Sequence, residues 1–206
     1  MSLPEYSNAP HIGPFLSMLP PNARLLVQAG GDDGGLGRKF RSIYPATSWL
    51  VVDADPKLTL KARAYADPVH LADLETVGDT FYKQLEWADG WIFDCTFERF
   101  RCPGKVLEQV RKVIQYDGCI VFRIANSGYW KQSAESRRNR LAIGDILGLL
   151  KDNGFRVVNG VLLIPAPMPQ DVADVLRRRA AQTGEKEELL QDDAQASHYL
   201  IKAMPA

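Results

Sequence analysis

Acidic side chains recur at the ends of short apolar runs in the first half of the sequence. The clearest cases are Asp53, Asp73 and Asp94. A carboxylate at the end of a buried strand can accept hydrogen bonds from the two hydroxyls of a ribose. We expect Asp53 to have this role, although the sequence DADP also has the pattern of a helix cap before a proline. Asp55 is the better candidate for that cap.

A glycine-rich turn precedes these acids, in the segment LLVQAGGDDGGLGRKF at residues 25–40. A strand that passes through glycines into a helix can bring backbone N–H groups close to a nucleotide. The turn lacks the pattern G-x-G-x-x-G, because Asp32 stands two residues after Gly30. A carboxylate at that position would repel a pyrophosphate, so dinucleotides and nucleotide sugars are disfavoured as ligands. A cofactor without phosphates is favoured.

Composition narrows the class of protein. The 206 residues suit a single domain, and 46% hydrophobic with 24% charged residues is ordinary for a soluble globular protein. Lys+Arg and Asp+Glu both number 25, so no net charge favours nucleic acid, and the arginine runs ESRRNR and LRRRAA are more typical of solvated helix faces.

Three cysteines without a C-x-x-C pair indicate neither a zinc site nor a redox dithiol, and we expect no metal. Without a signal-peptide pattern or a membrane-spanning run, the expected setting is cytoplasmic, with no membrane partner.

Strand and helix patterns alternate along the chain. Strands are expected at residues 24–29, 48–55, 68–73, 88–95, 119–126, 155–165 and 197–205. Helices are expected at residues 15–19, 36–44, 56–66, 74–85, 103–118, 138–154 and 169–184. Residues 183–195 are expected to form a mobile polar loop. This alternation predicts an α/β fold with an open, twisted, mostly parallel sheet of about seven strands, helices on both faces, and a last strand that could be antiparallel.

The order and spacing of five segments resemble the class I, Rossmann-like S-adenosylmethionine-dependent methyltransferases, in particular the compact bacterial type 11/23 kind. PPNARLLVQAGGDDGGLGRKF resembles their first strand and glycine turn, and WLVVDADP their second strand with its ribose-binding acid. VHLADLE is similar to their G-D-x-E segment, whose acid lies by the adenine. ADGWIFDCTFERFRCPGKVLEQVRKVIQYDGCIVFRIAN and LLKDNGFRVV resemble the later motifs. The resemblance covers nearly the whole chain, which we treat as one domain, 1–206, with a helical lead-in (1–22) and a helix and mobile loop (166–195).

The resemblance implies S-adenosylmethionine as cofactor and S-adenosylhomocysteine as product. The cofactor side is then expected to comprise Gln28, Gly30, Gly31, Asp32, Asp53, Ala54, Asp73 and Asp94. The acceptor side is expected to comprise Asn126, Tyr129 and Trp130, although the two aromatic residues also suit a lid or a dimer contact. Glu98 and Asp94 are the candidate catalytic bases, and Tyr129 is a candidate aligning hydroxyl. For Glu98 the alternative is an acid that favours a helix start.

Several positions depart from the family pattern. Gln28 stands where the first motif usually has an acid, and Asp32 where it has its second glycine. The L-E-H signature reads Phe97-Glu98-Arg99 here, the P-G-G turn reads Tyr116-Asp117-Gly118, and P-N reads Ala125-Asn126. Either the turn has been rebuilt with its acid displaced to Asp32 or Asp33, or cofactor binding has been lost. Of the histidines His11, His70 and His198, only His70 is expected near the cleft, and packing at a strand end is the favoured role for it.

Two functions from different classes follow from these patterns. The first is S-adenosylmethionine-dependent methyl transfer to a small-molecule or saccharide-like acceptor. The second is a methyltransferase-like domain that no longer catalyses and acts as a binding or assembly module. A homodimer is compatible with both functions, and the sequence does not identify the acceptor.

Overall fold

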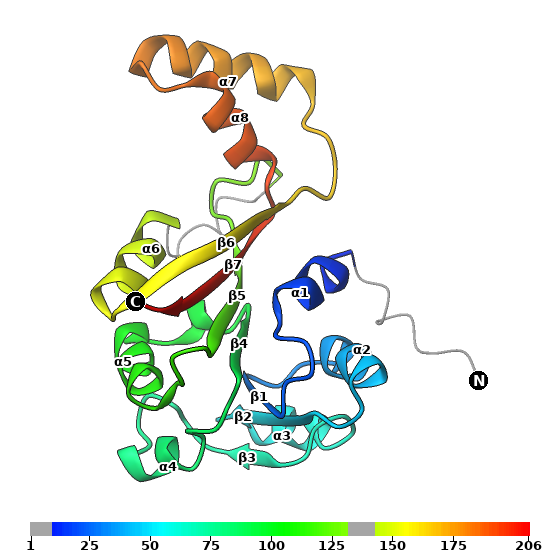
Figure 1. Cartoon of the computed structure of the whole chain (residues 1–206). Helices are drawn as coiled ribbons and strands as arrows, with labels where there is room; N and C mark the ends of the chain where they lie inside the picture. Colours follow the sequence, from blue (N-terminus) through cyan, green and yellow to red (C-terminus); the bar gives the residue numbers. More distant parts are fainter. Residues whose placement is uncertain (1–9, 132–142) are drawn as a thin grey trace, which may run out of the picture.

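The computed structural model describes residues 10–131 and 143–206, and a seven-stranded sheet forms its centre (Figure 1). The strands are β1 (Leu25–Ala29), β2 (Ser48–Asp53), β3 (Val69–Leu71), β4 (Gly90–Asp94), β5 (Cys119–Ala125), β6 (Phe155–Leu163) and β7 (His198–Pro205). Their spatial order is β3-β2-β1-β4-β5-β7-β6. The first five strands are parallel, whereas β7 is antiparallel to both of its neighbours. The predicted α/β architecture and the antiparallel last strand are confirmed.

Helices cover both faces of the sheet. The helices are α1 (Ile12–Met18), α2 (Gly35–Ile43), α3 (Pro56–Ala62), α4 (Asp79–Lys83), α5 (Pro103–Val113), α6 (Ile143–Asp152), α7 (Gln170–Thr183) and α8 (Glu187–Gln195), with a 3₁₀ helix, η2 (Phe97–Arg99). Apolar residues of α1, α2 and α3 form one core cluster with the sheet, and those of α4, α5 and α6 form the other. The described residues contain no helix that is long and apolar enough to cross a membrane.

The central strands are apolar on both faces because both faces are covered. In β4, Trp91, Ile92 and Phe93 are all fully buried, with Trp91 and Phe93 in one cluster and Ile92 in the other. Such continuous apolar runs are typical of parallel strands in α/β proteins. Truncating one of these large side chains to alanine would cost about 3–5 kcal/mol of stability. The polar residues that end these strands are therefore held on a rigid base.

Several helices are shorter than their sequence patterns predict, and α3 ends at Ala62 instead of residue 66. A helix was expected over residues 74–85, but α4 begins only at Asp79, after Gly78. Before it, the carbonyl of Asp73 accepts hydrogen bonds from the N–H groups of Thr76 and Val77, and this turn replaces the first part of the predicted helix. Similarly, α5 ends at Val113 instead of residue 118, since Ile114 is extended. The part of the predicted helix at residues 138–142 lies outside the described residues.

The prediction of a loop over residues 183–195 is wrong, because α8 occupies most of it. The helices α7 and α8 form a hairpin, here called the arm (residues 170–195), that projects from the end of the sheet beyond β6 and β7 (Figure 1). α8 contains two apolar residues, Leu189 and Leu190, but the segment is polar overall. Its composition alone therefore predicts a loop. The only buried residues of the two helices are Ala180 and Ala194.

Candidate functional site

The strand order reverses between β1 and β4, and the loops that follow these two strands meet closely. Such a reversal is where open α/β sheets bind ligands. Gly30 has a φ of 98°, and a Cβ there would lie 2.2 Å from Cγ2 of Thr96. The Thr96 hydroxyl donates a hydrogen bond of 2.7 Å to the carbonyl of Ala29. Glycine is therefore required at position 30, both for its backbone conformation and for the contact with Thr96.

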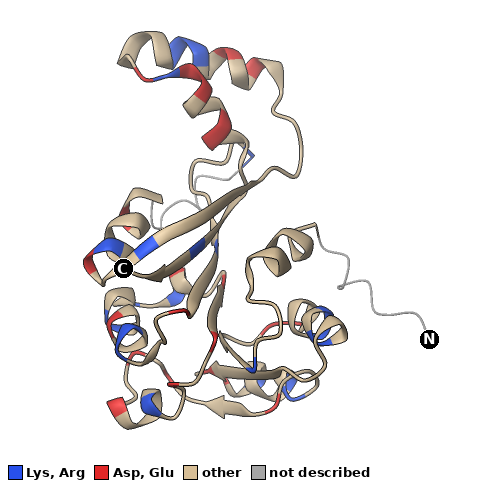
Figure 2. Cartoon of the chain, viewed as in Figure 1, with Lys and Arg blue, Asp and Glu red and all other residues tan. Residues whose placement is uncertain are grey.

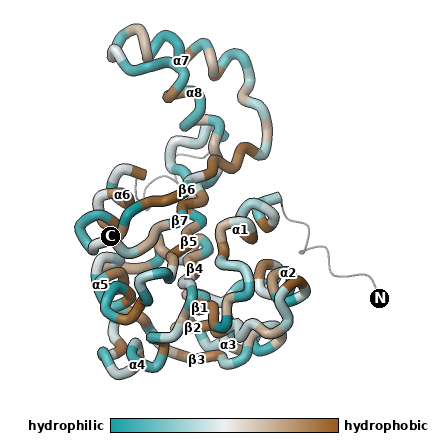
Figure 3. The backbone as a smooth tube through the Cα atoms, in the orientation of Figure 1, coloured by the Kyte–Doolittle hydropathy of each residue, from teal (hydrophilic) through white to brown (hydrophobic). Residues whose placement is uncertain are grey.

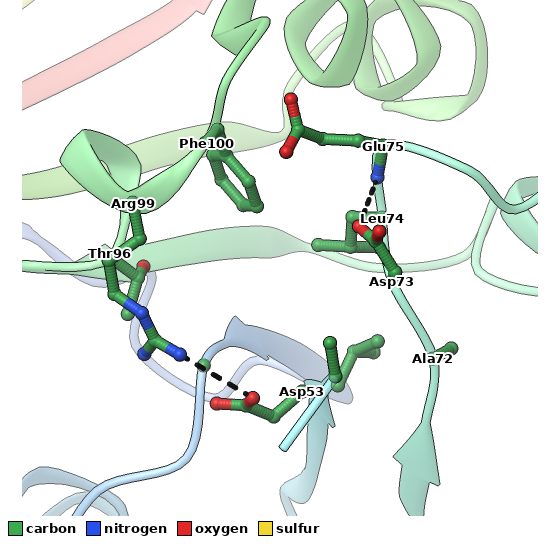
Figure 4. A pocket seen from close by; sticks show the side chains of 11 residues that line it. Asp53, Ala72, Asp73, Leu74, Glu75, Thr96, Arg99 and Phe100 are labelled. Atoms are coloured by element: carbon green, nitrogen blue, oxygen red, sulfur yellow. Dashed lines mark hydrogen bonds and ion pairs between the residues drawn. The ribbon is translucent and has the colours of Figure 1, made fainter.

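A first cavity of about 220 Å³ lies at the carboxyl ends of β2 and β3 and beside η2 (Figure 4). Its lining comprises Gly30, Val52, Asp53, Ala54, Ala72, Asp73, Leu74, Glu75, Thr96, Arg99 and Phe100. Apolar side chains such as Val52, Leu74 and Phe100 share this wall with three carboxylates and one guanidinium. The cavity thus combines a flat apolar wall with polar groups that can orient a ligand.

Asp53 is the last residue of β2, and its side chain, which is only 2% exposed, contacts the glycine turn. Its Oδ2 accepts a hydrogen bond of 2.8 Å from the N–H of Gly31, and its Oδ1 accepts one of 2.7 Å from the N–H of Asp55. The Nη2 of Arg99 lies 3.6 Å from the same Oδ1, as Figure 4 shows. Backbone donors therefore fix the carboxylate, while Arg99, which is half exposed, can move away from it.

The other two acids of the first cavity are held in the same manner. Asp73 Oδ1 accepts a hydrogen bond of 2.9 Å from the N–H of Glu75, and Asp73 Oδ2 has no hydrogen-bond donor within residues 10–131 and 143–206. The Glu75 carboxylate accepts hydrogen bonds from the N–H groups of Arg101 and Cys102. Asp73 consequently keeps a free oxygen on the cavity side, where Figure 4 shows its side chain.

A second cavity, of about 210 Å³, lies on the face of the sheet that α1 and α2 cover. It is lined by His11, Ile12, Asp32, Asp33, Gly35, Leu36, Asp94 and Arg123. The glycine turn supplies the two neighbouring aspartates, and the ends of β4 and β5 supply Asp94 and Arg123. The turn that begins at Gly30 therefore has a cavity on each side.

An ion pair between Asp94 and Arg123 crosses the second cavity, with side-chain exposures of 5% and 19%. Burial raises the pKa of Asp94, and the guanidinium of Arg123 opposes this effect. Burial also raises the pKa of Asp32; a hydrogen bond from the Gly34 N–H opposes that shift. Burial lowers the pKa of His11 to about 4, and the charge of Arg123 adds to the shift, so His11 is neutral at pH 7. The cavity thus presents one cation together with several carboxylates.

The residues predicted for the cofactor side divide between the two cavities. Gly30, Asp53, Ala54 and Asp73 line the first, and Asp32 and Asp94 line the second. Gly31 donates its N–H to Asp53 between them. Gln28 lines neither: it is buried, its amide nitrogen donates to the carbonyl of Gly30 (2.9 Å), and its oxygen accepts from Nε1 of Trp49 (2.8 Å). That these residues bind a cofactor remains a prediction.

Glu98, the candidate base, lies in η2 beside the end of β5. Its Oε1 accepts a hydrogen bond of 2.9 Å from the N–H of Ala125. Its Oε2 is buried and has no hydrogen-bond partner within the described ranges. A buried carboxylate oxygen without a donor is costly, so it is a feature that function can explain.

The predicted acceptor residues lie where the loop after β5 meets α8. The Asn126 amide donates to the carbonyls of Asp193 (2.6 Å) and Ala196 (2.9 Å), and its oxygen accepts from the N–H of Gly128. The rings of Tyr129 and Trp130 are edge to face, 5.7 Å apart, and Nε1 of Trp130 is buried without a partner among the described residues. Asn126 therefore has a structural role, and an acceptor contact for these three residues remains a prediction.

The prediction that His70 packs at a strand end is confirmed, but the expectation that it is the one histidine near the cleft is wrong. His70, on β3, packs edge-on against Phe81 and lines neither cavity, whereas His11 lines the second. Arg123 and Arg99 were likewise not assigned to the site from the sequence. Arg123 carries one available signal, since it is a lone charge within the apolar run CIVFRIA. The position of His11 depends on how α1 folds back over the sheet, for which its local sequence has no signal.

No protein-family model and no curated protein matches the sequence. The chain is similar in structure to an S-adenosylmethionine-dependent methyltransferase from Mesorhizobium loti, with a TM-score of 0.65, 16% identity, and 97% of this chain and 99% of that chain covered. It is also similar to the plantazolicin methyltransferase BpumL in complex with SAH (TM-score 0.62, 12% identity, 97% and 87% covered). For the mitomycin 7-O-methyltransferase MmcR the TM-score is 0.60 at 14% identity, with 95% of this chain but 53% of that chain covered.

These similarities define the class of fold. The chain has the Rossmann-like fold of the class I S-adenosylmethionine-dependent methyltransferases, over nearly its whole length. The names of the last two structures give different substrates, mitomycin and plantazolicin, so the shared fold does not identify an acceptor.

Proposed function

We propose that this chain is an S-adenosylmethionine-dependent methyltransferase whose cofactor extends from the first cavity to the second. The observation that carries the proposal is the arrangement of Asp53 and Asp73 in one cavity at the switch point of the sheet. Both carboxylates are fixed by backbone N–H groups. Their remaining lone pairs can accept hydrogen bonds from a nucleoside.

The first cavity fits the adenosine part of the cofactor. Asp53 would accept hydrogen bonds from the ribose hydroxyls once Arg99 moves off its Oδ1. Asp73 would lie by the adenine, with its free Oδ2 as an acceptor for an amino group. Leu74 and Phe100 provide apolar surface for the base. The lining holds three carboxylates, Asp53, Asp73 and Glu75, against the single cation Arg99, which disfavours a pyrophosphate and favours a ligand that lacks phosphates.

The second cavity fits the amino-acid end of the cofactor. Arg123 would bind its carboxylate, and Asp32 and Asp33 would bind its ammonium group. These aspartates would replace the acid that is Gln28 in this chain. When bound, S-adenosylmethionine supplies an electrophilic methyl group. The contribution of the protein is to hold this group and the acceptor in line.

For the acceptor we propose a small or saccharide-like molecule that carries a hydroxyl or amine. Glu98 is the proposed base: Ala125 fixes its Oε1, and its unpartnered Oε2 can take the proton that such an acceptor loses. Tyr129 is proposed to align the acceptor. Asp94, which forms the ion pair with Arg123, is better placed to position that arginine than to accept a proton.

The alternative, a binding module without catalysis, is favoured by two contacts. Both polar atoms of the Gln28 amide are hydrogen-bonded inside the protein, and Arg99 lies beside an oxygen of Asp53 that a ribose would need. A site that has lost its function should not distinguish S-adenosylhomocysteine from adenosine. The two functions therefore differ in ligand preference.

Calorimetric titration with S-adenosylhomocysteine and with adenosine tests the proposal. We expect micromolar binding of S-adenosylhomocysteine, weaker binding of adenosine, and a loss of at least about 100-fold in the Asp53→Ala variant, equal to about 2.7 kcal/mol. Asp55→Asn is the matched control, because Asp55 caps α3 in the same loop without lining either cavity. Absence of heat at millimolar ligand, or equal affinities for both ligands, would favour the non-catalytic module.

A further inference from the structure

The arginines of this protein differ in whether they have a carboxylate partner. In the arm, which is largely hydrophilic (Figure 3), Arg177 and Arg179 form ion pairs with acids of the same hairpin. On α2, Arg38 and Arg41 form no ion pair with any residue of the ranges 10–131 and 143–206. The charges of the arm are thus balanced locally, whereas those of α2 are not balanced by a contact within the described residues.

The surface around these two arginines is basic. Neither α2 nor α3 contains an acidic residue, and Figure 2 shows Lys and Arg on both helices. The basic residues of α2, of the last turn of α3 and of the position that follows it are Arg38, Lys39, Arg41, Lys61 and Arg63. Because the net charge of the whole chain is zero, this is a local excess of positive charge, and it favours the approach of an anion.

A third cavity, of about 360 Å³, opens at the centre of this basic surface, between α2 and the residues that follow α3. Its lining comprises Arg38, Arg41, Ser42, Pro45, Ala64 and Tyr65. The lining contains no carboxylate and shares no residue with the linings of the first and second cavities. The two arginines are three positions apart on α2 and therefore lie on the same face of this helix. The cavity thus combines two cations with apolar surface.

Backbone carbonyls hold both guanidinium groups in place. Nη1 of Arg38 donates to the carbonyl of Asp33, and this guanidinium lies over the ring of Tyr65, 5.4 Å from its centroid. Nη1 of Arg41 donates to the carbonyl of Tyr65 at a distance of 3.1 Å. A guanidinium has five N–H groups, so each arginine keeps most of its donors for a ligand. Planar donors that are held in this way suit the oxygens of a phosphate group.

We propose that the third cavity binds a small phosphate ester. The two guanidiniums match the charge of a phosphate monoester, which is about −1.5 to −2 at pH 7. The third cavity is larger than the first and the second, so it has room for an organic group that packs against Pro45 and the ring of Tyr65. Its lining is separate from that of the proposed cofactor site, so this ligand is distinct from the cofactor and the proposal does not depend on methyl transfer.

Calorimetric titration of the full chain with phenyl phosphate tests this proposal, because the ring of this probe can pack against Tyr65. We expect a dissociation constant below about 1 mM, and one that is at least about tenfold higher in Arg41→Gln. Arg63→Gln is the matched control: it removes the same charge from the same surface, but Arg63 lies outside the lining. A dissociation constant above about 10 mM for the wild type, or an equal loss of affinity in the two variants, overturns the proposal.

A second variant and two further ligands sharpen the test. Arg41→Lys keeps the charge and a donor for the carbonyl of Tyr65 but loses the planar donor group, so we expect binding about threefold weaker than in the wild type, and unchanged affinity would overturn the proposed geometry. Circular dichroism confirms that each variant is folded. Inorganic phosphate that binds as tightly as phenyl phosphate would overturn the ester as the ligand. A single-stranded oligonucleotide that binds about 100-fold more tightly would overturn the small-molecule site in favour of a nucleic-acid surface.

Discussion

The two cavities share one glycine turn but hold their charged groups in different ways. In the first, backbone N–H groups of Gly31 and Asp55 bind the carboxylate of Asp53. In the second, the side chain of Arg123 binds Asp94, and Asp32 is partly buried close to other carboxylates. Backbone donors are fixed by the fold itself, whereas a buried ion pair must overcome the desolvation of both partners. The first cavity is therefore preorganised. The charged groups of the second cavity stay available to a ligand, but their burial lowers the stability of the folded protein.

Breaking the ion pair is expected to have the largest effect. Arg123→Gln leaves Asp94 buried without its cation, which should lower the free energy of unfolding by about 3 kcal/mol and the Tm by about 6–12 °C. Differential scanning calorimetry measures the change. Arg24→Gln is the control, because Arg24 is 80% exposed and only 3.8 Å from Asp89 in a surface pair that contributes about 1 kcal/mol or less. Adding Asp94→Asn to Arg123→Gln should recover part of the loss; no recovery would show that the buried charge is not its cause.

Asp32→Asn is expected to have a smaller effect in the opposite direction. Because burial raises the pKa of Asp32 in the folded protein, ionisation of this group destabilises the fold, and the cost appears as the pH rises above the ordinary pKa of an aspartate. The variant keeps an oxygen for the Gly34 N–H, so its Tm at pH 7 should rise by about 2–4 °C, and the gain should disappear in acid. Under the proposed function, Asp32→Asn should also weaken the binding of S-adenosylhomocysteine but not the binding of adenosine. A Tm that falls at pH 7 would contradict the view that this cavity reduces stability.

His11→Gln is expected to have the smallest effect, visible only as a dependence on pH. The folded protein favours the neutral imidazole, since burial lowers the pKa of His11 from its ordinary value of 6.5 to about 4. The wild type should therefore lose stability as the pH falls from about 6.5 to about 4, by about 1 kcal/mol once solvent screening of this half-buried group is included. Urea titrations across this pH range should show a shallower loss in His11→Gln. His70→Gln, at a histidine that lines neither cavity, is the control and should retain the slope of the wild type.

The parallel strands could be predicted because a protein of this size can bury continuous apolar runs in few ways other than a parallel sheet covered on both faces. The end of β2 at Asp53 and the cap at Asp55 follow from local chemistry and are found as expected. The helix α8 was missed because its acidic composition resembles a loop, and its existence depends on its contacts with α7. The placement of His11 and the ion pair of Asp94 with Arg123 depend on contacts between distant segments. No local pattern could predict them.

The contact between Gln28 and Trp49 has a consequence for how this sequence can change over time. The indole N–H and the carbonyl of Gly30 together require a side chain that is both acceptor and donor and long enough to reach them. Aspartate, which would give this position the acid of the motif that the sequence resembles, is one methylene shorter and cannot donate when ionised. The substitution Gln28→Asp alone should therefore be unfavourable, and Trp49 would have to change first or at the same time. Gln28 and Trp49 therefore depend on each other, and a substitution of either residue alone should be unfavourable.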